Sequence, residues 1–312
     1  MSTGAELHGI LVTFRRPGDL ETMLRNLANQ SRSVDRLLVV DNDNDPNVHR
    51  IVTTNSDAAK LVEYLPSAEN IGPAGALALG CREIMRTADD QTWVMFFDDD
   101  DPPRTRDGLS EIVSFAELMV RRDPATGGAG VVGAEFNVRS GLTRRLANHE
   151  LVGPIPVAYI GGNQLPCYRM LALRNVGVPN SDLFFGFDDL EYGLRMRSAG
   201  WNLYVNGEIV ARERHAYGRY GAEARPDKKI ISVGWRDYYN TRNLVWILKS
   251  HHHRVAALRY VAKRVVGKAV YNSSRNPGLA WRYLTVGFRA AFDGYTGRLG
   301  KTVEPTASKT GM

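Results

Sequence analysis

The chain has 312 residues, 43% of them hydrophobic, which is enough apolar sequence for a substantial core in one large domain or two ordinary ones. Its two cysteines, Cys81 and Cys167, exclude a disulfide framework and a CxxC zinc site, and this favours a reducing cytoplasm. The N-terminus lacks the pattern of a signal peptide, and no uninterrupted apolar run reaches the ~18 residues that span a bilayer, so we expect neither export nor an integral membrane protein.

The first hundred residues alternate between strand and helix patterns. Short apolar, β-branched runs predict strands, and apolar residues at helical spacing predict helices. In chain order we expect a strand at 9–14, a helix at 19–30, strands at 36–40 and 60–65, a helix at 75–86, a strand at 92–97 and a helix at 107–122. This alternation predicts parallel βαβ units, and therefore an α/β fold with a Rossmann-like, mostly parallel sheet flanked by helices.

The later chain changes character twice. After residue 122 it is rich in glycine and then polar up to residue 150, which is typical of strands and hairpins. From residue 246 it is helical and basic, and residues 302–312 read as a disordered tail. We therefore expect a nucleotide-binding and catalytic domain at 1–245, a helical basic extension at 246–301 and a disordered tail at 302–312.

The net charge of +6 is unevenly distributed. Residues 249–301 contain eleven Lys and Arg against one acidic residue, Asp293, so this segment carries +10 and the remainder −4. A basic segment attached to a mildly acidic body suggests an anionic partner, such as a lipid surface or a nucleic acid.

Three of the expected strands end in polar residues. These are Thr13, the pair Asp41 and Asn42, and the run Asp98–Asp101. Ligands of open parallel sheets bind beyond the carboxyl ends of the strands, so we expect these residues to converge on one crevice.

The aspartate run is the strongest chemical signal. Four carboxylates follow an aromatic strand and precede Pro102 and Pro103, which cannot continue a strand ladder. Their charges repel one another unless a cation is present, and Mg²⁺ or Mn²⁺ binds one or two carboxylates together with substrate phosphates. A solvated acidic turn or a helix N-cap explains four aspartates equally well, but the buried strand before them favours the metal.

A second acidic pair, Asp188 and Asp189, follows the aromatic run Leu183–Phe187 and opens a helical pattern. The simpler interpretation is a helix N-terminus, where the dipole favours anions. The alternative is that one carboxylate in an aromatic pocket acts as a general base for an acceptor hydroxyl.

Two weaker signals remain. Asn70 precedes Gly72 and Gly75, which permit close backbone approach at a helix start, a usual place for a diphosphate, although a plain turn is as good an explanation. The pattern is neither GxGxxG nor GxxxxGK[ST], which disfavours hydride-transfer and P-loop sites. His215 stands alone, and a lone histidine is more often structural than a metal ligand.

These motifs, in this order, resemble those of the family 2 inverting glycosyltransferases of the GT-A fold, and within them the bacterial rhamnosyl- and galactofuranosyltransferase branch that extends cell-wall glycans. The resemblance covers roughly residues 8–245. It is carried by the series VTFRRP, VVDN, ENIGPAGALALG, WVMFFDDDD, GGN, FFGFDDLEYGLR, the histidine at 215 and YYNTRNLVW.

The resemblance implies roles for the acidic residues. Asp98 and Asp100 match the DxD motif that binds Mn²⁺ or Mg²⁺ and the sugar nucleotide, with Asp99 touching the sugar and His215 completing the metal site. Asp189 matches the catalytic base, and Asp188 would bind the acceptor or the donor sugar.

The resemblance also implies a binding site around them. The expected contacts of the nucleobase and ribose are Thr13, Phe14, Arg16, Asp41 and Asn70, and those of the diphosphate are Gly72 and Gly75. The expected floor of the donor-sugar and acceptor site is Gly161, Gly162 and Asn163, and Arg242 and Asn243 would lie near its rim.

Two departures bear on the donor. The chain has Asp41-Asn42-Asp43-Asn44 where many relatives have DDGS, and FDD where ED is commoner. Both favour UDP-galactofuranose, with dTDP-rhamnose as the alternative. A sugar-nucleotidyltransferase is disfavoured because VTFRRPGD lacks its Gly-rich, basic signature, and a non-catalytic sugar-binding module leaves the acidic crevice unexplained.

The basic extension suits a lipid-linked glycan acceptor. Leu258, Val261, Val265 and Ala269 can share one helix face, as in a helix lying on anionic lipid at the inner face of the plasma membrane. Packing of this face on the catalytic domain or in a homo-oligomer is the alternative. On this interpretation no nucleic acid is involved.

Overall fold

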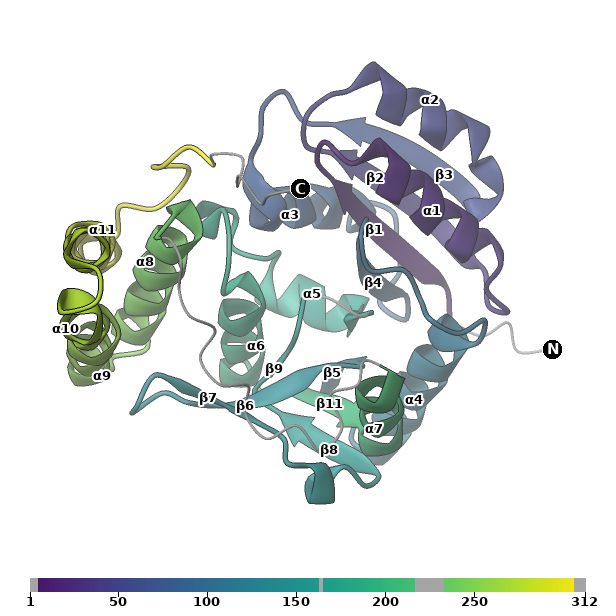
Figure 1. Cartoon of the computed structure of the whole chain (residues 1–312). Coiled ribbons are helices and arrows are strands. Elements are labelled where there is room, and N and C mark those ends of the chain that lie inside the picture. Colours follow the sequence, from purple (N-terminus) through teal and green to yellow (C-terminus); the bar gives the residue numbers. More distant parts are fainter. Residues whose placement is uncertain (1–4, 163–164, 217–232, 306–312) are drawn as a thin grey trace. The chain divides into compact units, whose positions relative to one another are not determined.

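The computed structural model describes residues 5–162, 165–216 and 233–305, which divide into two compact units (Figure 1). The described residues of the first unit are 5–135, 145–162, 165–181 and 188–216. Those of the second are 136–144, 182–187 and 233–305. The boundary predicted at residue 246 falls inside a helix of the second unit, α8 (Trp235–Ser250).

The first unit is built on an eight-stranded sheet with the strand order β3-β2-β1-β4-β10-β5-β11-β8. Strands β1 to β4 are parallel, as predicted, whereas β10 pairs antiparallel with both β4 and β5. The strands are β1 (Leu7–Thr13), β2 (Val34–Asp41), β3 (Ala59–Pro66), β4 (Trp93–Asp98), β5 (Thr126–Gly130), β8 (Pro154–Val157), β10 (Cys167–Arg169) and β11 (Asn202–Asn206). The α/β fold with a mostly parallel sheet is thereby confirmed.

Helices cover both faces of this sheet because alternate strand residues point to opposite sides. Leu11 and Leu37 belong to a core shared with α1 (Pro17–Ala28), α2 (Pro46–Thr54) and α4 (Gly108–Arg122). Ile10 and Leu38 belong to the opposite core, shared with α3 (Gly72–Ile84), α5 (Met170–Val176) and α6 (Asp188–Ser198). Figure 1 shows α1 and α2 on one side of strands β1 to β3 and α3 on the other.

Several helices of this unit were not predicted, and α2 is one of them. In α2, Asp45 is the N-cap, its carboxylate accepts a hydrogen bond from the Asn47 N–H, and Pro46 occupies the first turn. The Asp-Pro pair is the local signal that could have revealed this helix.

The smaller strands follow the glycine-rich segment, as expected. The unit contains β9 (Tyr159–Ile160), which pairs antiparallel with the first residues of β6 (Gly133–Asn137). The next strand is β7 (Leu142–Arg145). Residues 136–144, which include the end of β6, the turn and most of β7, belong to the second unit. The first unit ends its described part with α7 (Gly207–Ala216).

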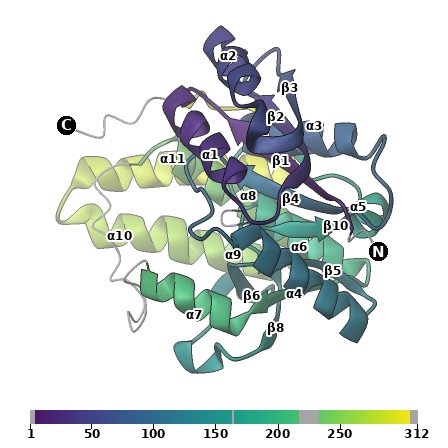
Figure 2. The same ribbon diagram turned by 90° about the vertical axis from the view of Figure 1, so that its right-hand side faces the viewer.

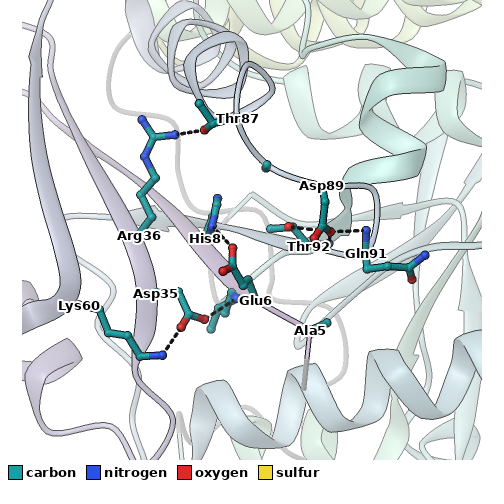
Figure 3. Close-up of polar contacts among 12 residues, drawn as sticks. Ala5, Glu6, His8, Asp35, Arg36, Lys60, Thr87, Asp89, Gln91 and Thr92 are labelled. Carbon is teal, nitrogen blue, oxygen red and sulfur yellow. Dashed lines mark hydrogen bonds and ion pairs between the residues drawn. The ribbon is translucent and has the colours of Figure 1, made fainter. Parts of the chain in front are cut away.

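The amino ends of the strands carry a separate polar network (Figure 3). The carboxylate of Asp35 accepts hydrogen bonds from the Leu7 N–H at 2.8 Å and from the Lys60 ammonium. Arg36 donates to the Thr87 hydroxyl at 2.9 Å, and buried His8 contacts Glu6 at 3.0 Å. These contacts fix the strand edge that lies at the opposite end of β1 from Thr13.

The second unit is a helical bundle. Its helices are α8, α9 (Arg254–Val261), a π-helical turn (Ala262–Val266), α10 (Gly267–Ser273) and α11 (Pro277–Thr296). Figure 2 shows α10 and α11 running side by side. Residues 302 and 303, which the sequence assigned to a disordered tail, are packed on α8: Thr302 contacts the Tyr238 hydroxyl at 2.9 Å, and the Val303 carbonyl accepts a hydrogen bond from Tyr239 at 2.7 Å.

Candidate active site

Strand register brings the three polar strand ends together, as the sequence predicted. Thr13 of β1 is paired with Asp41 of β2, and Val12 is paired with Asp98 of β4. The loops beyond are also joined, since the Asn42 N–H donates to the Thr13 carbonyl at 2.9 Å. The carboxyl edge of the sheet is therefore one continuous polar site within the first unit.

The aspartate run is fixed by residues of the β1 loop. The Thr13 hydroxyl donates to Asp99 Oδ2 at 2.7 Å, and Arg16 donates to Asp99 Oδ1 at 3.2 Å. The same Arg16 guanidinium pairs with Asp100. Thr13 and Arg16 therefore orient the carboxylates, and their expected contacts with the nucleobase and ribose stay a prediction.

Asp98 lies among like charges at the end of β4. Burial, together with the charges of Asp100, Asp99 and Asp101, raises its pKa to about 7, and the charge of Arg16 opposes this rise. A half-buried carboxylate beside three like charges favours the binding of a cation.

The donor set suits a hard divalent cation. Asp98 and Asp100 offer carboxylate oxygens, and Mg²⁺ and Mn²⁺ complete such sites with substrate phosphates and water. Within residues 5–162, 165–216 and 233–305, no three His, Cys, Asp or Glu side chains are grouped to hold a metal. His215 is exposed in the last turn of α7, and its predicted role as third ligand stays a prediction.

The β2 end forms a second hydrogen-bonded layer. Buried Asp41 accepts from the N–H groups of Asp43 and Asp45, at 3.0 and 2.7 Å, and from the Tyr64 hydroxyl at 2.8 Å. Through these hydrogen bonds the Asp41 carboxylate fixes the loop that follows β2. Its expected contact with the nucleotide stays a prediction.

Asn42, which directly follows β2, joins the β2 loop to the start of α3. Its amide donates to Asn70 Oδ1 at 3.2 Å and accepts from the Ile71 N–H at 2.9 Å. Asn70 in turn accepts from the Gly72 N–H at 2.9 Å, and Gly72 has a φ of +72°, which favours glycine. A Cβ on Gly75 would lie 2.9 Å from Ile71 Cβ, so this turn requires small residues.

The second acidic pair lies at the start of α6. Asp189 Oδ2 accepts from the Gly162 N–H at 3.3 Å, and its Oδ1 accepts from the Leu190 N–H at 2.7 Å. Burial raises the pKa of both Asp188 and Asp189, and the Asp189 charge raises that of Asp188 further. The charge of Asp98 also raises the pKa of Asp188, so the aspartate run and this pair share one electrostatic environment.

For three other predicted site residues, Gly161, Phe14 and Asn163, the structure gives little information about binding. Gly161 donates its N–H to the Val132 carbonyl at 2.8 Å and so belongs to the strand framework. Phe14 is half-buried with the Arg15 guanidinium 4.9 Å from its ring centre. Asn163 lies outside the described residues.

Ion pairs that the sequence did not reveal connect α7 to the chain after the aspartate run. Arg104 pairs with Glu213 at 3.4 Å, and Arg212 donates to the Glu111 carboxylate at 2.9 Å. They surround a cavity of about 30 Å³ whose lining includes Asp101. Because α7 carries His215, these pairs fix the helix on which the predicted third ligand stands.

In the second unit, an unusual loop leads directly into Asp188. Phe184, Gly186 and Phe187 have φ values of +59°, +81° and +62°. Such left-handed conformations cost about 1–3 kcal/mol each for residues other than glycine and persist only where the surroundings impose them. Phe184 is buried against Tyr239, with ring centres 4.9 Å apart.

Arg242 and Asn243 of α8 impose this conformation. The Asn243 amide nitrogen donates to the carbonyls of Leu183, Phe185 and Gly186 at 2.9, 3.0 and 2.7 Å. Arg242 donates to the Leu183 carbonyl at 2.8 Å and to the Gly300 carbonyl at 2.6 Å. Both side chains were expected at the rim of the site, and both are fully buried with these donors committed to backbone carbonyls.

Comparison with known proteins gives consistent results. Residues 10–118 match the model of glycosyl transferase family 2. The galactofuranosyltransferase GlfT1 of Mycolicibacterium smegmatis is 31% identical over 203 residues, which cover 61% of this chain and 65% of that protein. The chain thus spans slightly less than two thirds of the length of this relative.

Two solved structures are similar in fold. GalNAc-T7, solved with UDP, GalNAc and Mn²⁺, has a TM-score of 0.56 at 11% identity, covering 94% of this chain and 57% of that chain. Residues 1–349 of S. aureus TarS, solved with UDP, give a TM-score of 0.50 at 12% identity, covering 94% of this chain and 92% of that chain. The match to glycosyl transferase family 2 therefore covers residues 10–118, and the chain has the GT-A fold that the order of its sequence motifs implied.

Proposed function

We propose that this protein transfers galactofuranose from UDP-galactofuranose to a hydroxyl group of a lipid-linked glycan, with inversion at the anomeric carbon, at the inner face of the plasma membrane. The observation that supports the proposal most is that the half-buried pair Asp188 and Asp189 opens α6 and that the charge of Asp98 raises the pKa of Asp188. The similarity to GlfT1 supports galactofuranose as the sugar.

In this reaction the acceptor oxygen attacks the anomeric carbon as the bond from that carbon to the diphosphate oxygen breaks. The nucleoside diphosphate leaves with the electron pair, and the acceptor proton passes to Asp189. Burial raises the pKa of Asp189, which makes its carboxylate a stronger base near neutral pH. The N–H groups of Gly162 and Leu190 orient that carboxylate.

At the donor side, Asp98 and Asp100 would hold Mn²⁺ or Mg²⁺ together with the diphosphate, and His215 would complete the set. The cation supplies charge neutralisation for the leaving diphosphate. Thr13 and Arg16 keep Asp99 beside the donor sugar by their hydrogen bonds to its two oxygens. Arg16 pairs with Asp100 here and would turn from it towards the diphosphate when a cation binds.

The donor is tested by a comparative assay. UDP-galactofuranose, UDP-galactopyranose and dTDP-rhamnose are each incubated with the full chain and Mn²⁺, and release of the nucleoside diphosphate is measured with and without a chelator. We expect turnover with UDP-galactofuranose only and its loss with the chelator. Preference for dTDP-rhamnose would establish a rhamnosyltransferase instead, and indifference of thermal stability to UDP plus Mn²⁺ would contradict sugar transfer altogether.

Stereochemistry is tested separately. The anomeric configuration of the first product is read by nuclear magnetic resonance before it can equilibrate. An inverted product is expected from a single displacement, whereas retention would exclude Asp189 as a simple general base.

A further inference from the structure

The second unit presents apolar side chains on a surface that the sequence did not identify. The face expected to meet lipid is mostly inside the bundle, because Val265 and Ala269 are only 2% and 3% exposed. Val265 packs against Gly287 of α11, where an added Cβ would meet its methyl groups. Of that expected face, Leu258 alone is largely exposed, so the predicted lipid-binding face was wrong in its composition.

A different face of α11 is aromatic and exposed. Trp281, Phe288, Phe292 and Tyr295 are exposed in the structure, with Trp281 and Phe292 at 67% and 68%. Their spacing of seven, four and three residues places them within one narrow stripe of a helix that turns every 3.6 residues. Aromatic side chains of this size rarely remain exposed in a row without a partner.

The preceding helical segment carries a second exposed stripe. Val255, Leu258, Val266 and Val270 are exposed, at intervals of three, eight and four residues along α9, the π-helical turn and α10. The buried residues Ala257, Val265 and Ala269 lie on the other side, towards the bundle. The segment from α9 to α10 and the neighbouring helix α11 therefore each have one apolar face that is buried and another that is exposed.

The positive charge around these two stripes indicates which partner would bind to them. Residues 254–298 contain nine Lys and Arg, and their sole acidic residue, Asp293, is buried and accepts a hydrogen bond from Tyr238. A second copy of the chain would bring an equally basic face and be repelled. A nucleic acid would match the charge but leave the aliphatic stripe in water, whereas an anionic bilayer satisfies both.

We propose that α9 to α11 form a docking surface for an anionic lipid bilayer, in which Trp281, Phe288 and Phe292 enter the headgroup region and the flanking arginines bind lipid phosphates. Trp and Tyr favour the membrane interface, and basic residues beside it add attraction to anionic lipids. No described helix is long and apolar enough to cross a membrane, so binding is to the surface. Docking needs no sugar transfer and stands independently of the proposed reaction.

The test is co-sedimentation of the full chain with vesicles of phosphatidylcholine alone or with one third phosphatidylglycerol. We expect binding only to the anionic vesicles, and weaker binding as salt rises. The triple variant W281S/F288S/F292S should bind at least about ten-fold more weakly, because it removes most of the buried apolar area. L61S, at an exposed leucine of β3, is the matched control and should bind as the wild type does.

A second variant measures the contribution of charge separately from that of apolar area. R259Q/K263Q/R282Q removes three exposed charges and keeps the apolar stripes, and each lost charge should weaken binding about five-fold. Circular dichroism checks that each variant is folded. Equal binding to neutral and anionic vesicles, unchanged binding of the folded triple-serine variant, or a dimer in solution that this variant abolishes would each overturn the proposal.

Discussion

Arg242 donates a hydrogen bond from its Nε to the amide oxygen of Asn243 at 2.9 Å, and so turns the Asn243 amide nitrogen towards three carbonyls of the loop that ends at Asp188. The pair is a buried clamp on a left-handed backbone. Because the loop is covalently continuous with α6, its conformation sets where that helix begins.

The first prediction concerns this clamp. Asn243→Asp keeps the size of the side chain but places a carboxylate against three carbonyl oxygens, so the loop should be released. We expect turnover to fall by up to about 100-fold, as for a misplaced catalytic group, with little change in the KM for the donor. Hydrogen exchange of residues 182–187 should become faster in the variant.

Asn26→Asp is the matched control for the clamp, because Asn26 is a half-buried asparagine of α1 whose amide donates to a single carbonyl, that of Thr22, at 2.9 Å. It should leave both turnover and exchange unchanged. Normal turnover in a folded Asn243→Asp protein would show that the clamp does not position the catalytic pair.

The second prediction concerns the packing of α3 on the sheet. A Cβ on Gly80 would lie 2.6 Å from Ile10 Cγ2, so Gly80→Ala should push α3 from β1 and destabilise the protein by about 1–3 kcal/mol. Gly18 of α1 has no atom within 4 Å of an added Cβ, and Gly18→Ala should be neutral or stabilising. Urea unfolding measures both, and equal effects would contradict the close approach.

The third prediction is a pH dependence at the amino edge of the sheet (Figure 3). Burial by itself would raise the pKa of Asp35, but the Leu7 N–H and the Lys60 ammonium outweigh it and lower the pKa. The charged carboxylate therefore adds stability above its unfolded pKa of about 3.9, and that stability is lost as the pH falls through the lower folded value.

Asp35→Asn should thus be less stable than the wild type by about 1 kcal/mol at neutral pH, since the partly exposed pair is screened by solvent. The difference should disappear at an acid pH below the lowered folded pKa of Asp35, where both proteins carry a neutral side chain. Urea unfolding at both pH values measures it. A difference that is the same at both would mean that charge plays no part.

Much of this architecture could be predicted from local sequence. Parallel βαβ alternation placed Thr13, Asp41 and Asp98 at one edge, because strand direction follows from the pattern. The insertion of β10 between β4 and β5 could not be predicted, since a three-residue strand leaves almost no periodic signal.

The functions of Arg242 and Asn243 were also out of reach of the sequence. Their partners in the loop lie about sixty positions away, so no local spacing records the contact. The exposed face of α11 was missed for a similar reason. A helix with apolar residues on two sides does not itself reveal which side is buried. In α11 the buried side is the one that carries Gly287, because the missing side chain leaves room for Val265.

The fourth prediction concerns the metal. Asp98→Asn removes a carboxylate whose three charged neighbours favour the binding of a cation. In this variant Mn²⁺ should therefore no longer increase the thermal stabilisation given by UDP. Asp107→Asn, at an exposed position before α4, is the control and should respond to Mn²⁺ as the wild type does. An unchanged response in Asp98→Asn would place the cation elsewhere.

The most direct measurement is the rate of galactofuranose transfer by Asp189→Asn, with UDP affinity measured in parallel in the presence of Mn²⁺. The variant keeps the size of the side chain and one of its two hydrogen-bond-accepting oxygens, but it cannot take the proton of the acceptor hydroxyl. We predict a fall in transfer of about 10²- to 10⁴-fold with UDP affinity preserved. Transfer near the wild-type rate would contradict the assignment of Asp189 as the base and, with it, the account of this site.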